Sequence, residues 1–485
     1  MKILFSTAPL HKEIWGDLAE VGSLLPPLGL CYLAAVTREL GHETAILDCY
    51  AEKIDYSLAV ERIINENPDI VGISSTTQEI GAASLLAREL KKKKPALLVL
   101  IGGVHITSTP LETMKRYPDF DIGFIGEGEA AMAAFLKAYE KKEPLWSVSG
   151  LIFRCPTRMS AEMDNIPSQY YVSNEELVMT PRMGAISDLD TLPIPAFDLL
   201  PELATHYSPA ITNYKRSPVM GLVSSRGCPG QCTFCDRSMF GNRIRMHSVG
   251  RIMEIIDLLM NKYGIREINF YDDTLVAQRS RVIELCNHLI ENKVDLTWSC
   301  NARVNLVNPE LLQLMAKAGC WQISYGIESG EQALLDSLKK GITLEQVERA
   351  VKWSKEVGMQ IKAYYIIGLP GETRDSLRKT KESILGLPLD DICLEFFTPF
   401  PGTVLYDQIV AEGVPIPDWE DMNTLKLTYI PVGFEEKELR DAFKDIIKRF
   451  YLRPRIIYGY MKRFASPGKM ILLARVFFDF IRSKH

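Results

Sequence analysis

The chain has 485 residues, of which 47% are apolar and 24% are charged, and its formal net charge is −5. This length exceeds what one hydrophobic core supports, so it predicts two or three domains of ordinary globular composition. The acidic balance gives no reason to expect nucleic acid as a partner, and ten cysteines are too sparse for a disulfide scaffold.

The N-terminus and the hydropathy of the chain predict its compartment. Residues 1–10 contain one lysine and a short apolar run, without the long apolar region and cleavage site of a secretory signal. No stretch reaches the roughly 18–20 uninterrupted apolar residues that cross a bilayer. We therefore expect a cytoplasmic protein, in which clustered thiols indicate a metal site or catalysis.

The first third of the chain alternates apolar runs with helical patterns. Five apolar runs are expected strands: 2–8, 42–48, 69–77, 96–105 and 121–129. Helical patterns lie between them, and strands alternating with helices predict a parallel sheet covered on both faces. Residues 1–145 are therefore expected to form a doubly wound α/β domain. Residues 146–213 are rich in Pro and Asp, show no sustained period and are expected to be a linker.

A second alternating block covers residues 214–436. Six runs are strand-like: 219–225, 267–273, 295–304, 321–329, 360–372 and 391–403. Repeated strand–helix units predict a partial or full (β/α) barrel, whose chemistry lies at the carboxyl ends of its strands.

The last segment, residues 437–485, is basic, aromatic and amphipathic. It is expected to be helical and either to cover the barrel with its aromatic face or to bind an anionic membrane surface. The second alternative would place the protein peripherally at the inner face of the membrane. A tRNA-binding tail is less consistent with its apolar character.

Three cysteines stand close together in "SSRGCPGQCTFCDRSM", residues 224–239. Thiolates are soft ligands for iron–sulfur clusters, zinc and copper(I). Structural zinc needs four closed ligands, whereas Cys228, Cys232 and Cys235 are three, with no fourth Cys or His nearby. Three thiolates on a four-iron cluster leave one iron open for a substrate or cofactor. A zinc site with a remote fourth ligand and three unliganded thiols are the alternatives.

The "CPGQCTFC" loop resembles the cluster loop of the radical S-adenosylmethionine (SAM) superfamily. The resemblance implies a [4Fe-4S] cluster held by Cys228, Cys232 and Cys235, with SAM chelating the open iron. It further implies reductive cleavage of SAM to a 5′-deoxyadenosyl radical and an electron donor such as flavodoxin or ferredoxin. Phe234, between two of the thiols, would shield the cluster and flank the adenine, although core packing is the alternative.

Residues at later strand ends extend the resemblance. Asp272 and Asp273 would contact the SAM amino group, and Glu328 the ribose hydroxyls. Arg303 would meet the SAM carboxylate. The segment "IIGLPGET", with Ile367 and Gly368, would line the adenine. The structural alternatives are a solvated acidic turn for the two aspartates, a surface cation for Arg303 and a glycine–proline turn for the "IIGLPGET" segment.

The first domain lacks the dinucleotide fingerprint G-x-G-x-x-G after its first strand. Its segments "LLPPLGLCYLAAV", "GISSTTQ", "IGGVH" and "IGEGEAA" resemble the cobalamin-binding domain of class B radical SAM enzymes, a family that includes the anaerobic magnesium-protoporphyrin monomethyl ester cyclase group. The motif D-x-H-x-x-G, which supplies a lower ligand to cobalt, is absent. The resemblance implies cobalamin contacts from loops after the third to fifth strands: Ser74, Thr76, Thr77, Gln78, Gly102, Gly103, His105, Glu127, Gly128 and Glu129.

Together these resemblances imply a cobalamin-dependent radical SAM enzyme that modifies an unactivated carbon of an apolar or lipid-like small molecule, by methyl transfer. Oxidative cyclisation or rearrangement is the alternative of the same class. A tRNA methylthiotransferase would need a second cysteine triad, which Cys31, Cys49 and Cys155 do not form. A non-catalytic cobalamin or cluster sensor is the alternative of another class, and it would release no 5′-deoxyadenosine.

Overall fold

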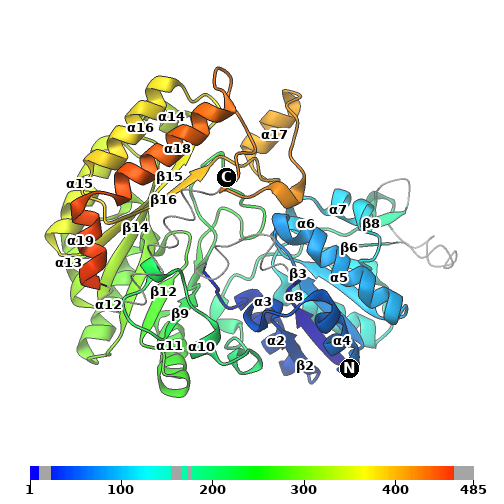
Figure 1. The fold of residues 1–485 in the computed structure, drawn as a ribbon. Coiled ribbons are helices and arrows are strands. Elements are labelled where there is room, and N and C mark those ends of the chain that lie inside the picture. The colour runs from blue at the N-terminus through cyan, green and yellow to red at the C-terminus, as the bar shows by residue number, and fades with distance from the viewer. Residues whose placement is uncertain (10–22, 155–166, 173–175, 464–485) are drawn as a thin grey trace.

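The computed structural model describes residues 1–9, 23–154, 167–172 and 176–463 (Figure 1). Two α/β units lie side by side, the first at the right of Figure 1 and the second at the left, with the cysteine loop in the region between them. The expected fold class, a doubly wound domain followed by a partial barrel and a helical C-terminal segment, is confirmed.

Five parallel strands form the centre of the first sheet, in the order β2-β1-β3-β4-β5. Their bounds are β1 (Lys2–Ser6), β2 (Glu43–Leu47), β3 (Ile70–Ser74), β4 (Leu98–Gly102) and β5 (Ile122–Phe124). One face packs on α2 (Leu28–Glu39) and α8 (Gly128–Glu140), and the other on α4 (Tyr56–Asn65) and α5 (Ile80–Lys93). Shorter helices complete the unit: α3 (Cys49–Glu52), α6 (Val104–Ser108) and α7 (Pro110–Arg116).

The structure differs from the expected linker over residues 146–213. Here β6 (Leu151–Arg154), β7 (Tyr171–Val172) and β8 (Leu177–Met179) extend the first sheet with antiparallel strands. These strands have two to four residues each, too few for a periodic pattern to show in the sequence. The rest of the segment includes α10 (Leu203–His206) and packs against both units. Leu203 joins the core of the half-barrel, and the Tyr207 hydroxyl donates to Asp48 Oδ2 of the first unit at 2.8 Å.

The second sheet has six parallel strands in chain order, from β9 to β16. Their bounds are β9 (Val219–Leu222), β12 (Glu267–Phe270), β13 (Thr297–Ala302), β14 (Cys320–Glu328), β15 (Gln360–Ile367) and β16 (Asp391–Phe396). The sheet curls into an open half-barrel, because β9 and β16 do not pair with each other (Figure 1). The helices on its outer side are α11 (Val249–Tyr263), α12 (Arg279–Glu291), α13 (Pro309–Lys317), α15 (Leu344–Glu356) and α16 (Arg374–Gly386).

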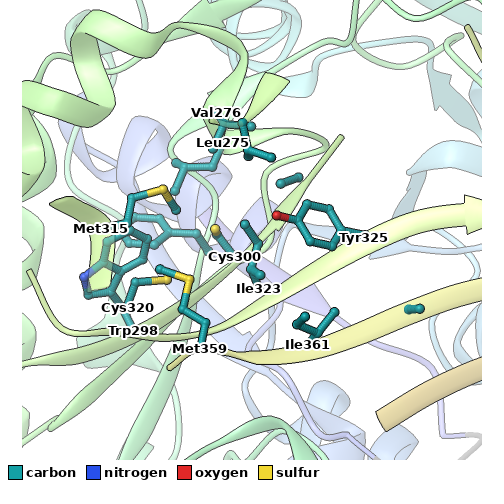
Figure 2. Packing of buried hydrophobic residues seen from close by; sticks show 14 of the residues in the cluster. Leu275, Val276, Trp298, Cys300, Met315, Cys320, Ile323, Tyr325, Met359 and Ile361 are labelled. Carbon is teal, nitrogen blue, oxygen red and sulfur yellow. The ribbon is translucent and has the colours of Figure 1, made fainter. Parts of the chain in front are cut away.

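Alternate residues of these strands face opposite sides of the half-barrel. Trp298, Cys300, Ile323, Tyr325 and Ile361 join the apolar core under the helices (Figure 2). The residues between them face the concave side and are mostly polar. They include Asn269, Ser299, Asn301, Gln322, Ser324, Lys362, Tyr364, Cys393 and Glu395. The half-barrel therefore has a hydrophobic outside layer and a polar inner surface.

The C-terminal segment begins with α18 (Glu436–Tyr451) and α19 (Pro454–Arg463). Leu439, Phe443, Ile446 and Phe450 of α18 are buried in the barrel core, as the cap alternative predicts. Residues 464–485 lie outside the described residues, so membrane contact stays a prediction. Within the described ranges, no helix is both long enough and apolar enough to cross a membrane.

Candidate functional site

The cysteine loop is closed at its base by a short antiparallel ladder. Strand β10 (Ser225–Arg226) pairs with β11 (Arg245–Met246), so the loop between them leaves the half-barrel next to β9 and returns to the same place. Gly227 opens the loop with φ of +86°, and an added Cβ there would lie 2.4 Å from the Arg243 carbonyl oxygen. Glycine is required at this position because its backbone is both left-handed and closely covered.

Two of the three thiols lie beside Gly230. A Cβ on Gly230 would lie 3.3 Å from Cys228 Sγ and 3.8 Å from Cys232 Sγ, so the bare backbone leaves room between two sulfurs. Cys235 keeps contact with solvent, but the packing around it and the Asp273 carboxylate raise the pKa of its thiol to about 12. Among the described residues, no three Cys, His, Asp or Glu side chains converge as on a single metal ion.

Gly227→Ala is expected to lower the iron content of the anaerobically reconstituted protein sharply, since the methyl group would displace the Arg243 carbonyl and open the base of the loop. Gly241→Ala is the matched control, because Gly241 also has a positive φ, +74°, but its Cβ would meet nothing within 4 Å. The control variant is destabilised only by the left-handed backbone conformation, which costs roughly 1–2 kcal/mol for a residue with a Cβ. Iron and sulfide assays compare the two, and equal loss in both would contradict the steric argument.

Three residues from later parts of the chain lie beside the cluster loop. The Arg303 guanidinium donates to Cys232 Sγ at 3.7 Å. Lys340 Nζ lies 2.6 Å from Glu328 Oε1 and 5.7 Å from the Phe234 ring centroid. The structure thus brings the predicted Phe234, Arg303 and Glu328 together. Sequence reasoning missed Lys340, because a lysine in a "LKKG" turn has no pattern that separates it from a surface cation.

The two aspartates after β12, Asp272 and Asp273, have different surroundings. Asp272 is fully buried and accepts hydrogen bonds from Ser224 N at 3.1 Å, from Ser224 Oγ at 2.8 Å and from the Ser225 hydroxyl. The Arg281 guanidinium lies 3.8 Å away. The prediction that Asp272 contacts SAM therefore needs correction, since its carboxylate supports the start of the cluster loop. Asp273 keeps contact with solvent and remains available, while the packing around its carboxyl group and the nearby Asp272 carboxylate raise its pKa.

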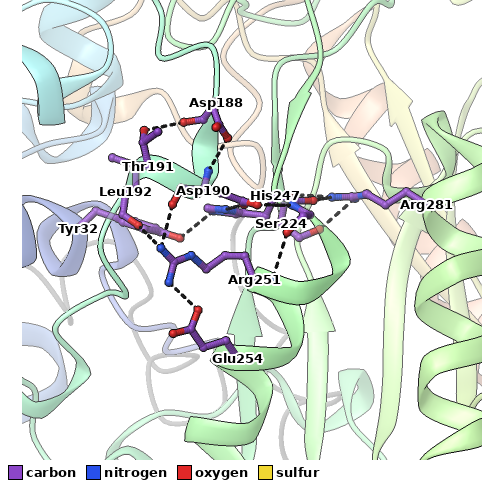
Figure 3. A network of polar contacts seen from close by, with 11 residues as sticks. Tyr32, Asp188, Asp190, Thr191, Leu192, Ser224, His247, Arg251, Glu254 and Arg281 are labelled. Carbon is purple, nitrogen blue, oxygen red and sulfur yellow. Dashed lines mark hydrogen bonds and ion pairs between the residues drawn. The ribbon is translucent and has the colours of Figure 1, made fainter.

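A polar network surrounds this support (Figure 3). His247 lies between Tyr32 Oη, at 3.2 Å, and Asp190 Oδ1, at 3.0 Å. Arg281 donates to the Ser224 and His247 carbonyl oxygens at 2.9 and 3.3 Å. The network joins the first domain, the segment before β9 and the half-barrel, so it fixes how the two units meet at the loop.

The segment after β15 contains a buried carboxyl group that the sequence did not assign. Gly368, with φ of +77°, donates its N–H to Glu372 Oε2 at 2.5 Å. Ile367 is fully buried in the core, and its predicted contact with the adenine stays a prediction. Burial raises the pKa of Glu372 from 4.5 to about 7.

The Glu372 pKa leads to a prediction for the pH dependence of stability. The folded state holds a proton that the unfolded state releases near pH 4.5, so this contribution is complete below pH 4.5 and is lost as the pH rises through about 7. The free energy of unfolding should fall over this window by roughly 3 kcal/mol. Urea denaturation at several pH values tests this, and Glu372→Gln should flatten the profile. An equally steep profile in the variant would contradict the assignment.

A cavity of about 270 Å³ lies at the carboxyl edge of the first sheet. Its walls include predicted cobalamin residues: Ser74, Gly102, Gly103, Glu127, Gly128 and Glu129. Phe240 and Arg226 of the cluster-loop region line its other side. A Cβ added to Gly102 would have no neighbouring atom within 4 Å, so the backbone of Gly102 is open to the cavity. The cavity fits part of a large cofactor held between the two units.

Four predicted cobalamin residues do not line this cavity: Thr76, Thr77, Gln78 and His105. His105 is fully buried, and its ring packs edge-on against Trp419 at 4.4 Å. Burial lowers the pKa of His105 to about 4, so it stays neutral. The expected position of His105 beside the corrin needs correction, because the segment around Trp419, distant in sequence, covers it.

Comparison with known proteins identifies the family. Residues 14–136 match the model of the B12 binding domain, and residues 222–384 that of the radical SAM superfamily. An uncharacterised methyltransferase of Pyrococcus horikoshii is 33% identical over 94% of both chains. The chain belongs to the cobalamin-binding radical SAM enzymes. The resemblance inferred from the sequence is thereby confirmed, as is the expectation of an enzyme.

Two other relatives are less similar in sequence. The anaerobic magnesium-protoporphyrin IX monomethyl ester cyclase of Rubrivivax gelatinosus is 26% identical over 99% of this chain and 84% of its own. Among solved structures, the radical SAM methyltransferase TsrM of Kitasatospora setae, with cobalamin and a [4Fe-4S] cluster bound, superposes with a TM-score of 0.71 at 16% identity, covering 94% of this chain and 89% of its own. This likeness confirms the order and arrangement of the two units.

Proposed function

We propose that this radical SAM enzyme transfers a methyl group to an unactivated carbon of a small molecule. The observation that carries the proposal is the position of the cysteine loop. Its base borders the cavity of the cobalamin domain, and its Cys232 thiol contacts Arg303, which follows strand β13 of the half-barrel. When bound, the [4Fe-4S] cluster, SAM and cobalamin supply one-electron reduction, a carbon-centred radical and a transferable methyl group.

The chain's own residues bind and orient these groups. Cys228, Cys232 and Cys235 would hold the cluster, and the cations of Arg303 and Lys340 would attract the SAM carboxylate beside it. Among relatives, a cytidylyl-2-hydroxyethylphosphonate methyltransferase of Streptomyces wedmorensis is 28% identical over 81% of this chain. Methyltransferase relatives of this kind favour methyl transfer, while the cyclase relatives keep oxidative cyclisation as the second candidate.

The polar concave surface supports a substrate with hydrogen-bonding groups. Lys362 is buried there, with Nζ 3.0 Å from Asn213 Oδ1 and 3.8 Å from Asp391 Oδ2. Asn301 lies at the same level of the sheet as Lys362, and Tyr364 and Glu395 lie further along toward the carboxyl ends of the strands. Buried polar groups select ligands that can pair with them. The apolar or lipid-like substrate expected from the sequence stays a prediction, which these residues do not favour.

An electron donor would reach the cluster over the outer side of the loop. A cavity of about 280 Å³ there is lined by Pro229, Gln231, Thr233, Arg237, Asn242, Lys339 and Val404, and no acidic side chain is among them. Such a surface suits an acidic redox protein of the flavodoxin or ferredoxin type.

Product analysis tests the proposed function. The protein is reconstituted without oxygen with iron, sulfide and hydroxocobalamin, then incubated with SAM and a reductant, and SAM products are measured by mass spectrometry. Deoxyadenosine together with S-adenosylhomocysteine is expected for methyl transfer. Deoxyadenosine alone would favour cyclisation or rearrangement, and neither product would contradict the proposal.

A further inference from the structure

Two arginines at the base of the cluster loop form buried ion pairs with glutamates of the first domain. Arg226 Nη1 lies 2.9 Å from Glu127 Oε2, and Arg226 Nη2 lies 2.5 Å from Glu129 Oε1. Arg245, paired with Arg226 across the β10–β11 ladder, places Nη2 2.5 Å from Glu127 Oε1. All four side chains are at most 7% exposed. We call this group of Arg226, Arg245, Glu127 and Glu129 the clamp.

The clamp is electrically balanced, with two guanidinium groups against two carboxylates. Buried charges are costly unless they are paired and hydrogen-bonded, so the geometry of the group is tightly specified. The Arg226 guanidinium also lies 5.3 Å from the ring centroids of both Tyr32 and Phe240. A lysine could not make the two-pronged contact with both carboxylates, because only guanidinium presents a planar fork.

The position of the clamp connects the two cofactor regions. Arg226 is separated from Cys228 only by Gly227, whose backbone is closely covered. Glu127 and Glu129 lie at the start of α8 and line the cavity of the cobalamin domain together with Arg226. A shift of either carboxylate would therefore be transmitted to the cysteine loop through one rigid turn.

We propose that the clamp residues are positioning residues that fix the separation between the iron–sulfur cluster and cobalamin, an inference that rests on the proposed function. The carboxylates of Glu127 and Glu129 act on the arginines rather than on cobalamin, in place of the direct contacts expected from the sequence. A loosened clamp leaves both cofactors bound but varies their separation, so radical formation is less well coupled to methyl transfer.

Pulsed electron paramagnetic resonance tests this proposal on the reconstituted, reduced holoenzyme, in which the cluster and cob(II)alamin each carry an unpaired electron. The variants are Glu129→Gln, which keeps the side-chain volume, and Arg226→Lys, which keeps the charge. Both are expected to retain iron and cobalamin and to give a broader or shifted distance distribution between the two spins. They should also give a higher ratio of deoxyadenosine to S-adenosylhomocysteine. Glu129→Asp should partly restore both readouts.

The control is Asp295→Asn, which breaks an exposed ion pair with Arg216, 2.7 Å long, at the opposite end of the half-barrel strands. It should change neither readout. An unaltered distance distribution in both clamp variants would overturn the proposal while leaving the proposed function intact. Loss of cobalamin from Glu129→Gln but not from Arg226→Lys would also overturn it, since the carboxylate would then be a direct cobalamin contact. A native protein without either spin signal would overturn the proposed function itself, and the clamp with it.

Discussion

Cys232→Ala is expected to abolish formation of 5′-deoxyadenosine from SAM while cobalamin binding is retained. Cys232 is the most buried of the three thiols, at 7% exposed, and it contacts the Arg303 guanidinium. Two thiolates cannot hold a four-iron cluster with a single open iron. The cobalamin cavity lies on the other side of the loop base and has no wall formed by Cys232. Deoxyadenosine is measured by mass spectrometry and cobalamin by its absorption spectrum.

Cys286→Ser is the matched control for this variant, since Cys286 is a fully buried core thiol on α12, remote from the loop in sequence and assigned to the barrel core. It should keep the iron content and deoxyadenosine formation of the native protein. Full turnover by Cys232→Ala would show that the cluster assignment is wrong.

Asp272→Ala is expected to cause the largest loss of stability among these variants. The substitution leaves the buried Arg281 without its nearest carboxylate and removes the acceptor of three hydrogen bonds at the start of the cluster loop. Breaking one partner of a buried ion pair costs roughly 3–5 kcal/mol. The midpoint of urea denaturation, measured by circular dichroism, should therefore shift to a clearly lower urea concentration.

Asp272→Asn separates the two causes of this loss. It keeps the shape of the side chain and part of its hydrogen bonding but removes the charge that faces Arg281. An intermediate midpoint is expected. A midpoint for Asp272→Ala equal to that of the native protein would contradict the supporting role of Asp272 and would return it to the residues available for SAM.

The main architecture was predictable because the pattern that predicts each strand lies within the residues of that strand. Each run of the two alternating blocks became a parallel strand. Helices cover both faces of the first sheet, so its strands carry a nearly continuous apolar pattern. The half-barrel strands instead alternate between apolar residues on the outer face and mostly polar residues on the concave face. The strands β6 to β8 were missed because segments of two to four residues hold too little pattern. β6 pairs with the edge strand β5, β8 pairs with β6, and β7 pairs with β8. These pairings form only once the first sheet has folded and presents that edge.

Residues of the site were predictable where spacing alone carries the chemistry, as in Cys228, Cys232 and Cys235. Residues whose role depends on a distant partner were not. His105 looked accessible after a strand end but is covered by Trp419, more than three hundred residues later. Glu127, expected at the cofactor, is paired with arginines of the cluster loop, a contact that no local pattern indicates.

Electron paramagnetic resonance of the reduced protein, before and after addition of SAM, tests directly whether the cluster has an open iron. A [4Fe-4S]⁺ signal whose g-values shift when SAM binds is expected, because one iron lacks a protein ligand. A protein without iron, or a cluster whose signal is identical with and without SAM, would contradict an open iron held by Cys228, Cys232 and Cys235.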